Sequence, residues 1–376
     1  MSFRSIISGL LLAFVFHACK TAPQEVARPV PMAAKPKNII LMIGDGMGLA
    51  QVSAALYANN NRLHLEEFPV IGFHKSHSYT SLITDSAAGA TAFACGIKTY
   101  NNAIGMDKDT LPCRSILEDA EANGLATGLV ATSTIVHATP AAFIAHQDIR
   151  MMYEGIAADF LKTEIDFFVG GGKRFFDRRD QDDRDLYREL VDKGYYVSDY
   201  SRATLGQIKV DPQKNFGYFT ADSDPLPIMA GRNYLPYASR LAAEFLEQHS
   251  KGKGFFLMIE GSQIDWAGHA NEGKWLIQEV LDFNRAIGEV LAFAKKRGDT
   301  LVIVTADHET GGLALNPKSK FGRIKTAFTI NNHTATMIPV YAYGPMAELF
   351  SGIYENTEIH DKMYRAFGFE ASTAAH

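Results

Sequence analysis

Cysteine is scarce in this chain, and its scarcity excludes one class of metal site. The 376 residues include only three cysteines, Cys19, Cys95 and Cys113. No Cys-x-x-Cys spacing occurs among them, which argues against zinc sites built from paired thiolates. Cys95 lies among small residues and is expected to be a core thiol. A Cys95–Cys113 disulfide is left open for an oxidising compartment.

An excess of positive charge is also absent. Lysine and arginine number 37 against 42 aspartate and glutamate residues, for a formal net charge of -5. A broad basic surface is therefore not expected, and neither is specific binding of nucleic acid.

The N-terminus lacks an apolar run long enough to cross a bilayer. Ile6–Phe16 is too short for that, follows Arg4, and ends at Ala18-Cys19. The pattern predicts a signal peptide over residues 1–19 with a bacterial lipobox at Cys19, ordinary cleavage nearby being the alternative. Either reading predicts an exported protein, periplasmic or membrane-anchored through lipid on Cys19. Residues 20–37, rich in proline and alanine, predict an extended tether.

What the chain does have is a series of short apolar runs of about strand length. They are nearly continuous in apolar residues, as strands buried on both faces are. A helical stripe follows from Leu276 to Leu291. These features predict one α/β domain over residues 38–376, with a mostly parallel sheet covered by helices. The runs are Ile39–Ile43, Leu129–Ala131, Phe167–Val169, Phe255–Ile259, Leu301–Val304 and Ile338–Tyr343.

Three of these runs lead directly into acidic residues, Asp45, Glu260 and Asp307. Ligands of open parallel sheets bind outside the carboxyl ends of the strands. Any one of these acids alone is more often a turn or cap residue. The three together predict a shared site.

Further metal-ligand types surround these acids. Asp265 and His269 are four residues apart, so in a helix both project from one face. His308 follows Asp307, and His333 precedes the last apolar run. Crowded carboxylates repel one another unless cations bind among them. Imidazole and carboxylate donors without thiolate suit a pair of zinc ions, and an oxygen-rich corner around Asp45 and Glu260 suits Mg²⁺.

Ser86 stands at the start of a small-residue stretch that is expected to form a helix. It is either an N-cap or a nucleophile placed where the helix dipole favours phosphate. No histidine or lysine adjoins it in sequence to act as a base, and a metal-bound serine needs none. Arg150 can bind a phosphate through two parallel hydrogen bonds, although a lone arginine is usually a surface residue.

Several motifs follow one another along the chain, namely Ile43-Gly-Asp-Gly-Met-Gly, Thr84-Asp-Ser-Ala-Ala-Gly-Ala-Thr-Ala, Cys95-Gly-Ile-Lys-Thr-Tyr-Asn, His137-Ala-Thr-Pro-Ala-Ala, Gly170-Gly-Gly, Glu260-Gly-Ser-Gln-Ile-Asp and Thr305-Ala-Asp-His-Glu-Thr-Gly-Gly. On these motifs the sequence, from Asn38 to about Tyr354, resembles the alkaline phosphatase family.

The resemblance implies a three-layer α/β/α sandwich that hydrolyses small phosphate monoesters through a phosphoserine on Ser86. It implies two zinc ions and one Mg²⁺, with Arg150 binding phosphate, and a homodimer. One zinc would be held by Asp265, His269 and His333, the other by Asp45, Asp307 and His308, and Mg²⁺ by Asp45, Thr139 and Glu260.

Two positions depart from the best-known bacterial pattern of the family. His137 stands where aspartate is often found, and Trp266 where lysine is often found. Both are expected beside the ligands, and the combination resembles a branch that includes cold-adapted enzymes. His137 leaves the identity of the third ion open. The short stretch between His308 and His333 also predicts that no large insertion covers the site.

Two other functions remain alternatives at this point. A phosphodiesterase or a sulfatase would keep the scaffold and change the ester. A non-catalytic phosphate-binding lipoprotein would keep the site and lose the reaction.

Overall fold

The computed structural model describes residues 34–369 of the chain. The predicted signal peptide with Cys19, residues 20–33 of the predicted tether and residues 370–376 lie outside the described part. Within residues 34–369, no helix combines the length and apolarity needed to cross a membrane.

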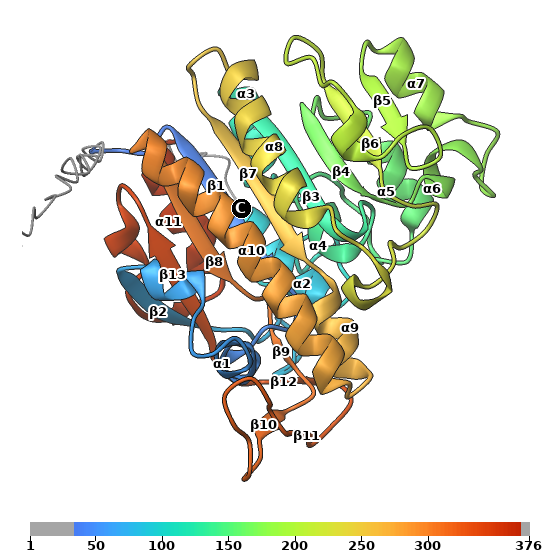
Figure 1. The fold of residues 1–376 in the computed structure, drawn as a ribbon. Coiled ribbons are helices and arrows are strands. Elements are labelled where there is room, and N and C mark those ends of the chain that lie inside the picture. The colour runs from blue at the N-terminus through green and yellow to red at the C-terminus, as the bar shows by residue number, and fades with distance from the viewer. Residues whose placement is uncertain (1–33, 370–376) are drawn as a thin grey trace, which may run out of the picture.

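The centre of the molecule is a ten-stranded sheet in the order β14-β2-β13-β8-β1-β7-β3-β4-β6-β5 (Figure 1). Among the described strands of this sheet, β13 alone runs antiparallel to its neighbours. The sheet is therefore mostly parallel, as the apolar runs predict. Its strands are β1 (Asn38–Gly44), β2 (Val70–Lys75), β3 (Ala126–Thr134), β4 (Phe167–Gly171), β5 (Tyr196–Asp199), β6 (Phe216–Phe219), β7 (Phe255–Gly261), β8 (Thr300–Thr305), β13 (Ile338–Tyr343) and β14 (Gly352–Glu355).

Every apolar run named from the sequence lies within one of these strands. Burial on both faces explains their composition. In β1, Ile39, Leu41 and Ile43 enter one core cluster, whereas Ile40 and Met42 enter the other. A strand with helices on both sides needs apolar residues at consecutive positions, not at alternate ones.

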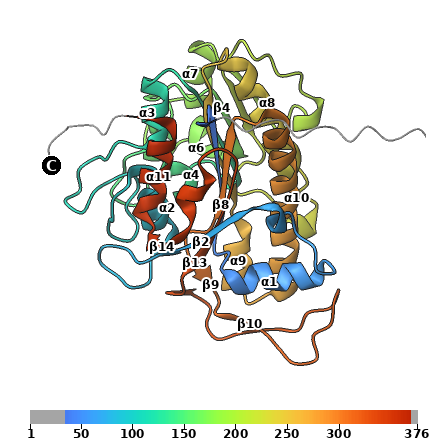
Figure 2. The ribbon, with the colours of Figure 1, turned by 90° about the vertical axis from the view of Figure 1, so that its left-hand side faces the viewer.

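Helices cover both faces of the sheet, which confirms the three-layer α/β/α fold (Figure 2). One face is covered by α1 (Leu49–Ala58), α8 (Leu235–His249), α9 (Gln263–His269) and α10 (Gly273–Arg297). The stripe from Leu276 to Leu291 lies within α10. The opposite face is covered by α2 (Ser86–Cys95), α3 (Ile116–Ala122), α4 (Ala138–Ala141) and α11 (Thr357–Phe367).

Smaller elements complete the fold. Near the β5 edge lie α5 (Tyr153–Asp159), α6 (Arg174–Asp177) and α7 (Leu186–Asp192). Short 3-10 helices span His64–Glu67, Leu205–Gln207, Ile228–Ala230 and Ala347–Phe350. Between His308 and His333 the chain forms β9 (Glu309–Thr310), β10 (Leu313–Leu315) and β11 (Thr326–Phe328), with β12 (His333–Thr334) pairing back on β9. Between His308 and His333 the structure thus contains only these short strands and their connecting loops, and no large insertion.

Cys95 and Cys113 are both free thiols in the structure. Cys95 is buried, as its small neighbours predict, and its Sγ donates to the backbone oxygen of Cys113 at 3.3 Å. The disulfide left open by the sequence is not formed.

Candidate active site

Three neighbouring strands deliver acids to one edge of the sheet. β1 lies between β8 and β7, and Ile43 is in register with both Thr305 and Glu260. Asp45 follows β1 and Asp307 follows β8. All of these carboxylates are fully buried. The strand order thus brings Asp45 together with Glu260 and Asp307, which lie more than 200 residues later in the sequence.

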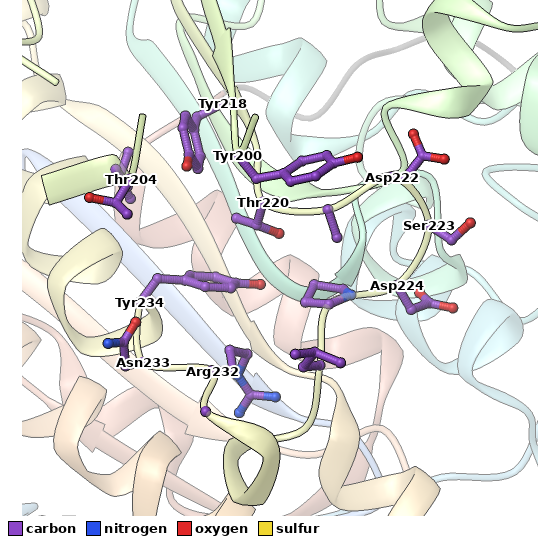
Figure 3. Close-up of a pocket in the computed structure, with 15 residues that line it drawn as sticks. Tyr200, Thr204, Tyr218, Thr220, Asp222, Ser223, Asp224, Arg232, Asn233 and Tyr234 are labelled. Carbon is purple, nitrogen blue, oxygen red and sulfur yellow. The ribbon is translucent and has the colours of Figure 1, made fainter. Parts of the chain in front are cut away.

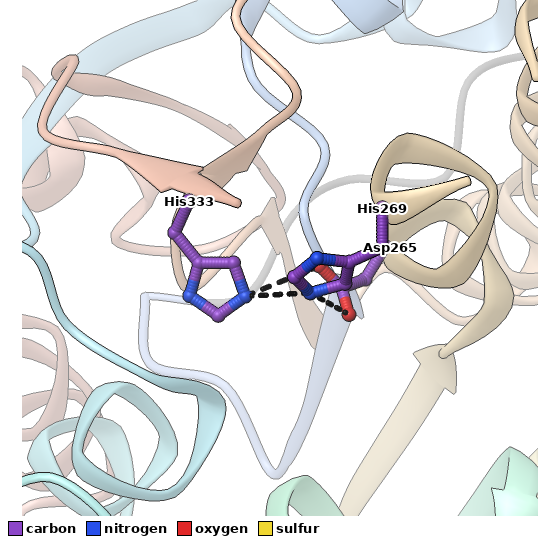
Figure 4. Close-up of side chains that lie close together, drawn as sticks. All are labelled: Asp265, His269 and His333. Carbon is purple, nitrogen blue, oxygen red and sulfur yellow. Dashed lines mark hydrogen bonds and ion pairs between the residues drawn. The ribbon is translucent and has the colours of Figure 1, made fainter. Parts of the chain in front are cut away.

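A first cluster joins Asp265, His269 and His333 (Figure 4). Asp265 and His269 project from one face of α9, as their spacing predicts, and β12 supplies His333. The Nε2 atoms of His269 and His333 lie 3.3 and 3.4 Å from the two Asp265 carboxylate oxygens. The two Nε2 atoms lie 3.0 Å from each other.

Backbone carbonyls fix which nitrogen of each imidazole carries the proton. His269 Nδ1 donates to Asn331 O at 2.8 Å, and His333 Nδ1 donates to Thr84 O at 2.9 Å. In the neutral rings both Nε2 lone pairs then face one gap, which needs a proton or a cation between them. The Asp265 hydrogen bond raises the pKa of His269 to about 9, so this gap favours positive charge.

A second cluster joins Asp45, Asp307 and His308. His308 Nε2 lies 3.1 Å from Asp307 Oδ2 and 3.5 Å from Asp45 Oδ1. Burial, with the adjacent charge of Asp307, raises the pKa of Asp45 well above its usual range. A carboxylate placed in this way is stabilised by a bound cation.

A third cluster joins Asp45, His137 and Glu260. Ser262 and Ser133 donate to Glu260 Oε2 at 2.6 and 3.3 Å, which leaves Oε1 free to accept another partner. Burial raises the pKa of Glu260 to about 7. The predicted ligand Thr139 is the second residue of α4, and its hydroxyl is buried.

The donor atoms of these clusters fit divalent cations. Among the described residues, Asp45 Oδ1 and Oδ2, Asp307 Oδ2, Glu260 Oε1 and Thr139 Oγ1 are buried without a hydrogen-bond partner. Leaving so many buried oxygens unsatisfied would be costly in a fold that places no cation among them. Each cluster also offers the oxygen and imidazole donors that zinc accepts.

His137 and Trp266 lie beside the ligands, as expected. Their rings meet edge to face with centroids 5.9 Å apart. His137 is closer to the clusters than a purely supporting residue would be, because one of its ring nitrogens lies with the Asp45 and Glu260 oxygens. Burial lowers the pKa of His137 to about 3, so its ring is neutral and has a lone pair to offer.

Ser86 lies at the N-terminus of α2 and faces the second cluster. Its Oγ is 3.4 Å from His308 Nε2. The N-cap is Asp85, whose carboxylate accepts from Ala88 N at 3.0 Å, and Ser86 is the first helical residue. The N-cap reading of Ser86 is therefore wrong, and its hydroxyl is free for another role.

Arg150, in the loop after α4, also lies beside the start of α2. Its Nη1 lies 3.1 Å from Asp85 Oδ2, and its Nη2 lies 3.3 Å from His137 Nε2. The guanidinium thus lies between the start of α2 and the third cluster. Asp85 both caps the helix of Ser86 and orients Arg150, a role that its position before Ser86 did not reveal.

Two glycines allow these segments to approach closely. Gly46 has φ of +72°, and a Cβ there would lie 2.7 Å from Thr310 Oγ1 and 2.9 Å from Asp265 Cα. A Cβ on Gly89 would lie 3.0 Å from Asp307 Cβ, where α2 passes the second cluster. Side chains at these positions would push apart the elements that carry the ligands.

Thr310 is a supporting residue that the sequence analysis did not single out. Its hydroxyl contacts Asp265 of the first cluster and His308 of the second. Alternate residues of an extended segment point to the same side, so the sequence could have predicted that Thr310 lies on the side of His308.

A separate pocket of about 530 Å³ lies near the ends of β4 and β6 (Figure 3). Tyr200, Tyr218 and Tyr234 line it, and the Tyr234 hydroxyl donates to Ala131 O at 2.7 Å. None of the predicted site residues lines this pocket. This pocket is therefore separate from the three clusters that carry the candidate ligands.

A family model described as alkaline phosphatase matches residues 36–329 and 322–369. The chain belongs to the alkaline phosphatase family. It is 33% identical to alkaline phosphatase 3 of Bacillus subtilis, over 89% of each chain. It is 30% identical to the Escherichia coli alkaline phosphatase, over 93% of this chain and 90% of that protein.

Solved structures of alkaline phosphatases agree with this assignment. The alkaline phosphatase of the Antarctic bacterium TAB5 is 44% identical and superposes with a TM-score of 0.84, over 90% of this chain and 99% of that one. A cold-active Shewanella enzyme is 29% identical with a TM-score of 0.80, over 87% of this chain and 99% of that one. The protein is thus a phosphatase of the family that hydrolyses phosphate monoesters, and it is similar to enzymes from cold environments.

Proposed function

We propose that this alkaline phosphatase hydrolyses small phosphate monoesters in two steps, with Ser86 as the nucleophile and a phosphoserine between the steps. The observation that carries the proposal is the position of Ser86 Oγ. It lies 3.4 Å from His308 Nε2, buried at the start of α2 and beside the second cluster of Asp45, Asp307 and His308. The first turn of a ten-residue helix also favours an incoming phosphate.

We further propose the identity of the ions. Asp265, His269 and His333 would hold one zinc ion, and Asp45, Asp307 and His308 a second. Asp45, Thr139 and Glu260 would hold Mg²⁺. When bound, these ions supply Lewis acidity for the attacking and leaving oxygens and lower the pKa of the serine hydroxyl.

The chain's own residues perform the remaining tasks. Ser86 Oγ gives its proton to solvent and attacks phosphorus. The bond between phosphorus and the alcohol oxygen breaks, and the alcohol oxygen takes a proton from solvent as it leaves. A water molecule then attacks the phosphoserine, and Ser86 regains its proton as inorganic phosphate leaves. Arg150 binds two phosphate oxygens in both steps, held at the correct angle by Asp85.

His137 affects which ion the site of Asp45 and Glu260 would hold. An imidazole donor favours zinc over Mg²⁺. A variant of the Antarctic enzyme in which one histidine is replaced by aspartate is described as having Mg bound in its M3 site. Anomalous scattering measured at the zinc edge, on crystals soaked with both ions, distinguishes zinc from Mg²⁺ at Asp45 and Glu260.

The test of the nucleophile is a Ser86→Ala variant. In the zinc-loaded protein, turnover of a chromogenic monoester is expected to fall on the order of 10³-fold or more. Phosphoserine, trapped by acid quenching with labelled phosphate, is expected to be absent. Ser239→Ala, at a buried serine of α8, is the matched control and keeps both signals. A normal burst and trapped phosphoserine in the Ser86 variant would refute the assignment.

The same preparation tests the alternatives. Arg150 favours a dianionic monoester. A clear preference for diesters or sulfate esters over monoesters would reassign the substrate. Phosphate binding without any hydrolysis would leave a binding protein.

We also propose a homodimer and an exported protein anchored through lipid on Cys19. Light scattering measures the molecular mass and so tests the homodimer. Incorporation of a labelled fatty acid, compared with a Cys19→Ser variant, tests the lipid anchor.

A further inference from the structure

Large apolar side chains are exposed beside the residues proposed to act on phosphate. Their exposed fractions are 73% for Leu82, 40% for Ile83, 50% for Ile149, 63% for Met151 and 43% for Ile330. We refer to these five residues as the apolar rim. Single exposed apolar residues are ordinary, but a group of them around one site marks a binding surface.

Leu82 and Ile83 belong to the segment that leads into Ser86. The next residue, Thr84, accepts the Nδ1 proton of His333 on its backbone oxygen at 2.9 Å. The backbone oxygen of Ile83 accepts from the Asn101 side chain at 3.1 Å. This part of the rim therefore adjoins both the nucleophile and the first cluster.

Ile149 and Met151 flank Arg150 directly. Arg150 N donates to Asn102 O at 2.8 Å, and Asn102 N donates to Asp85 at 3.1 Å. These two bonds hold the loop of Arg150 beside the segment of Leu82 and Ile83. The two parts of the rim consequently lie on segments that are tied to each other beside Asp85 and Arg150.

Ile330 completes the rim next to the first cluster. It precedes Asn331, whose backbone oxygen accepts from His269 Nδ1. His269 is also the most exposed residue of that cluster, with 39% of its side chain accessible, whereas Asp45, Asp307 and His308 are fully buried. Solvent therefore reaches the site mainly at His269 and, to a lesser extent, at Arg150, whose side chain is 18% accessible, and the rim residues adjoin these two along the chain.

We propose that the apolar rim binds the alcohol portion of the substrate, so that the enzyme prefers phosphate esters of apolar alcohols to those of polyols. This inference rests on the proposed function. Because the phosphate is held among buried charges, the alcohol extends outward and covers apolar surface. Transfer of an alkyl or aryl group from water to that surface lowers the free energy, whereas a polyol stays hydrated.

The test uses straight-chain monoesters that share one type of leaving group, namely ethyl, butyl and hexyl phosphate. In the zinc-loaded protein, kcat/KM is expected to rise about twofold for each added methylene, half of the free-energy effect of burying a methylene completely. A flat series would overturn the proposal. Failure to hydrolyse even ethyl phosphate would instead count against the proposed function.

Polar variants locate the effect. Leu82→Asn combined with Met151→Gln is expected to reduce the rise between ethyl and hexyl phosphate from about 16-fold to about fourfold or less. Inhibition by inorganic phosphate, which has no alcohol portion, checks that Arg150 still binds phosphate in the variant. Ile353→Asn is the matched control, because Ile353 is 63% exposed on the edge strand β14. An unchanged chain-length series in the rim variant would overturn the proposal.

Light scattering on the same variants gives a second decisive outcome. A rim variant that becomes monomeric while keeping the full chain-length dependence would show that the rim is a contact between copies of the chain, which also overturns the proposal. Loss of the chain-length dependence at an unchanged molecular mass supports it.

Discussion

The hydroxyl of Thr310 donates a hydrogen bond to Asp265, and the same oxygen lies 3.3 Å from His308 Nδ1. Because the one hydroxyl proton points to Asp265, the oxygen accepts from His308 Nδ1. The proton on Nδ1 leaves His308 Nε2 free to face Ser86 and Asp307. One threonine thus orients a ligand in each of the two proposed zinc sites.

Removing this hydroxyl is expected to weaken both sites together. Thr310→Val keeps the shape of the side chain and loses the two hydrogen bonds, so zinc affinity is expected to fall about 10–100-fold. Calorimetric titration of the metal-free protein with zinc measures the change in zinc affinity without relying on activity. Thr310→Ser keeps the hydroxyl and is expected to recover most of the affinity. Equal affinities for the Val variant and the unaltered protein would contradict this role.

Chelation is expected to remove both activity and stability. Among residues 34–369, the nearby imidazoles and Arg150 are then the groups that balance the buried carboxylates of Asp45, Asp307 and Glu260. Each ion present at about 100 times its Kd stabilises the fold by about 3 kcal/mol. Thermal unfolding before and after chelation, and after zinc is added back, measures this contribution. A melting temperature and an activity that survive exhaustive chelation would end the metal proposal.

Arg150 is expected to contribute mainly to phosphate binding in the transition state. Arg150→Ala should lower kcat/KM about 10²-fold, as the loss of one oxyanion donor commonly does. Arg150→Lys keeps the charge but not the two parallel hydrogen bonds, so it should recover only part of the loss. Inhibition by inorganic phosphate gives an independent measure. Phosphate inhibition that is equally strong in the Ala variant would assign the anion site to other groups.

The stability of the protein is expected to fall in the alkaline range because of His146. Burial lowers the pKa of His146, but the Glu118 carboxylate, 3.0 Å away, and the backbone oxygen of Gly105 outweigh burial and raise the pKa to about 9. The unfolded value is about 6.5. The stabilisation, about 1–3 kcal/mol, is therefore complete below pH 6.5 and is lost as the pH rises through 9.

Denaturant unfolding at pH 6, 7.5 and 9, with zinc saturating, measures this loss. His146→Gln removes the titrating group and should flatten the dependence over that range. His64→Gln, at an exposed histidine, is the control and should keep it. Parallel pH dependences for the His146 variant and the unaltered protein would show that another group is responsible.

The local parts of the site could be predicted because short-range patterns report short-range geometry. Continuous apolar runs identified strands buried on both faces, and the four-residue spacing of Asp265 and His269 placed both on one side of α9. The small residues after Ser86 predicted the helix that begins there. The ordered motifs then predicted the family, which the comparisons confirm.

Other features depended on contacts between distant segments, which no local period encodes. Asp85 caps α2 through a local bond from Ala88 N, but its second bond, from Arg150, joins segments 65 residues apart. Only the pairing of β12 with β9 brings His333 to His269 and places Thr310 beside Asp265. The sequence by itself determined which residue types were available at the strand ends. The tertiary structure decided which of them meet, because the order of strands in the sheet sets those distances.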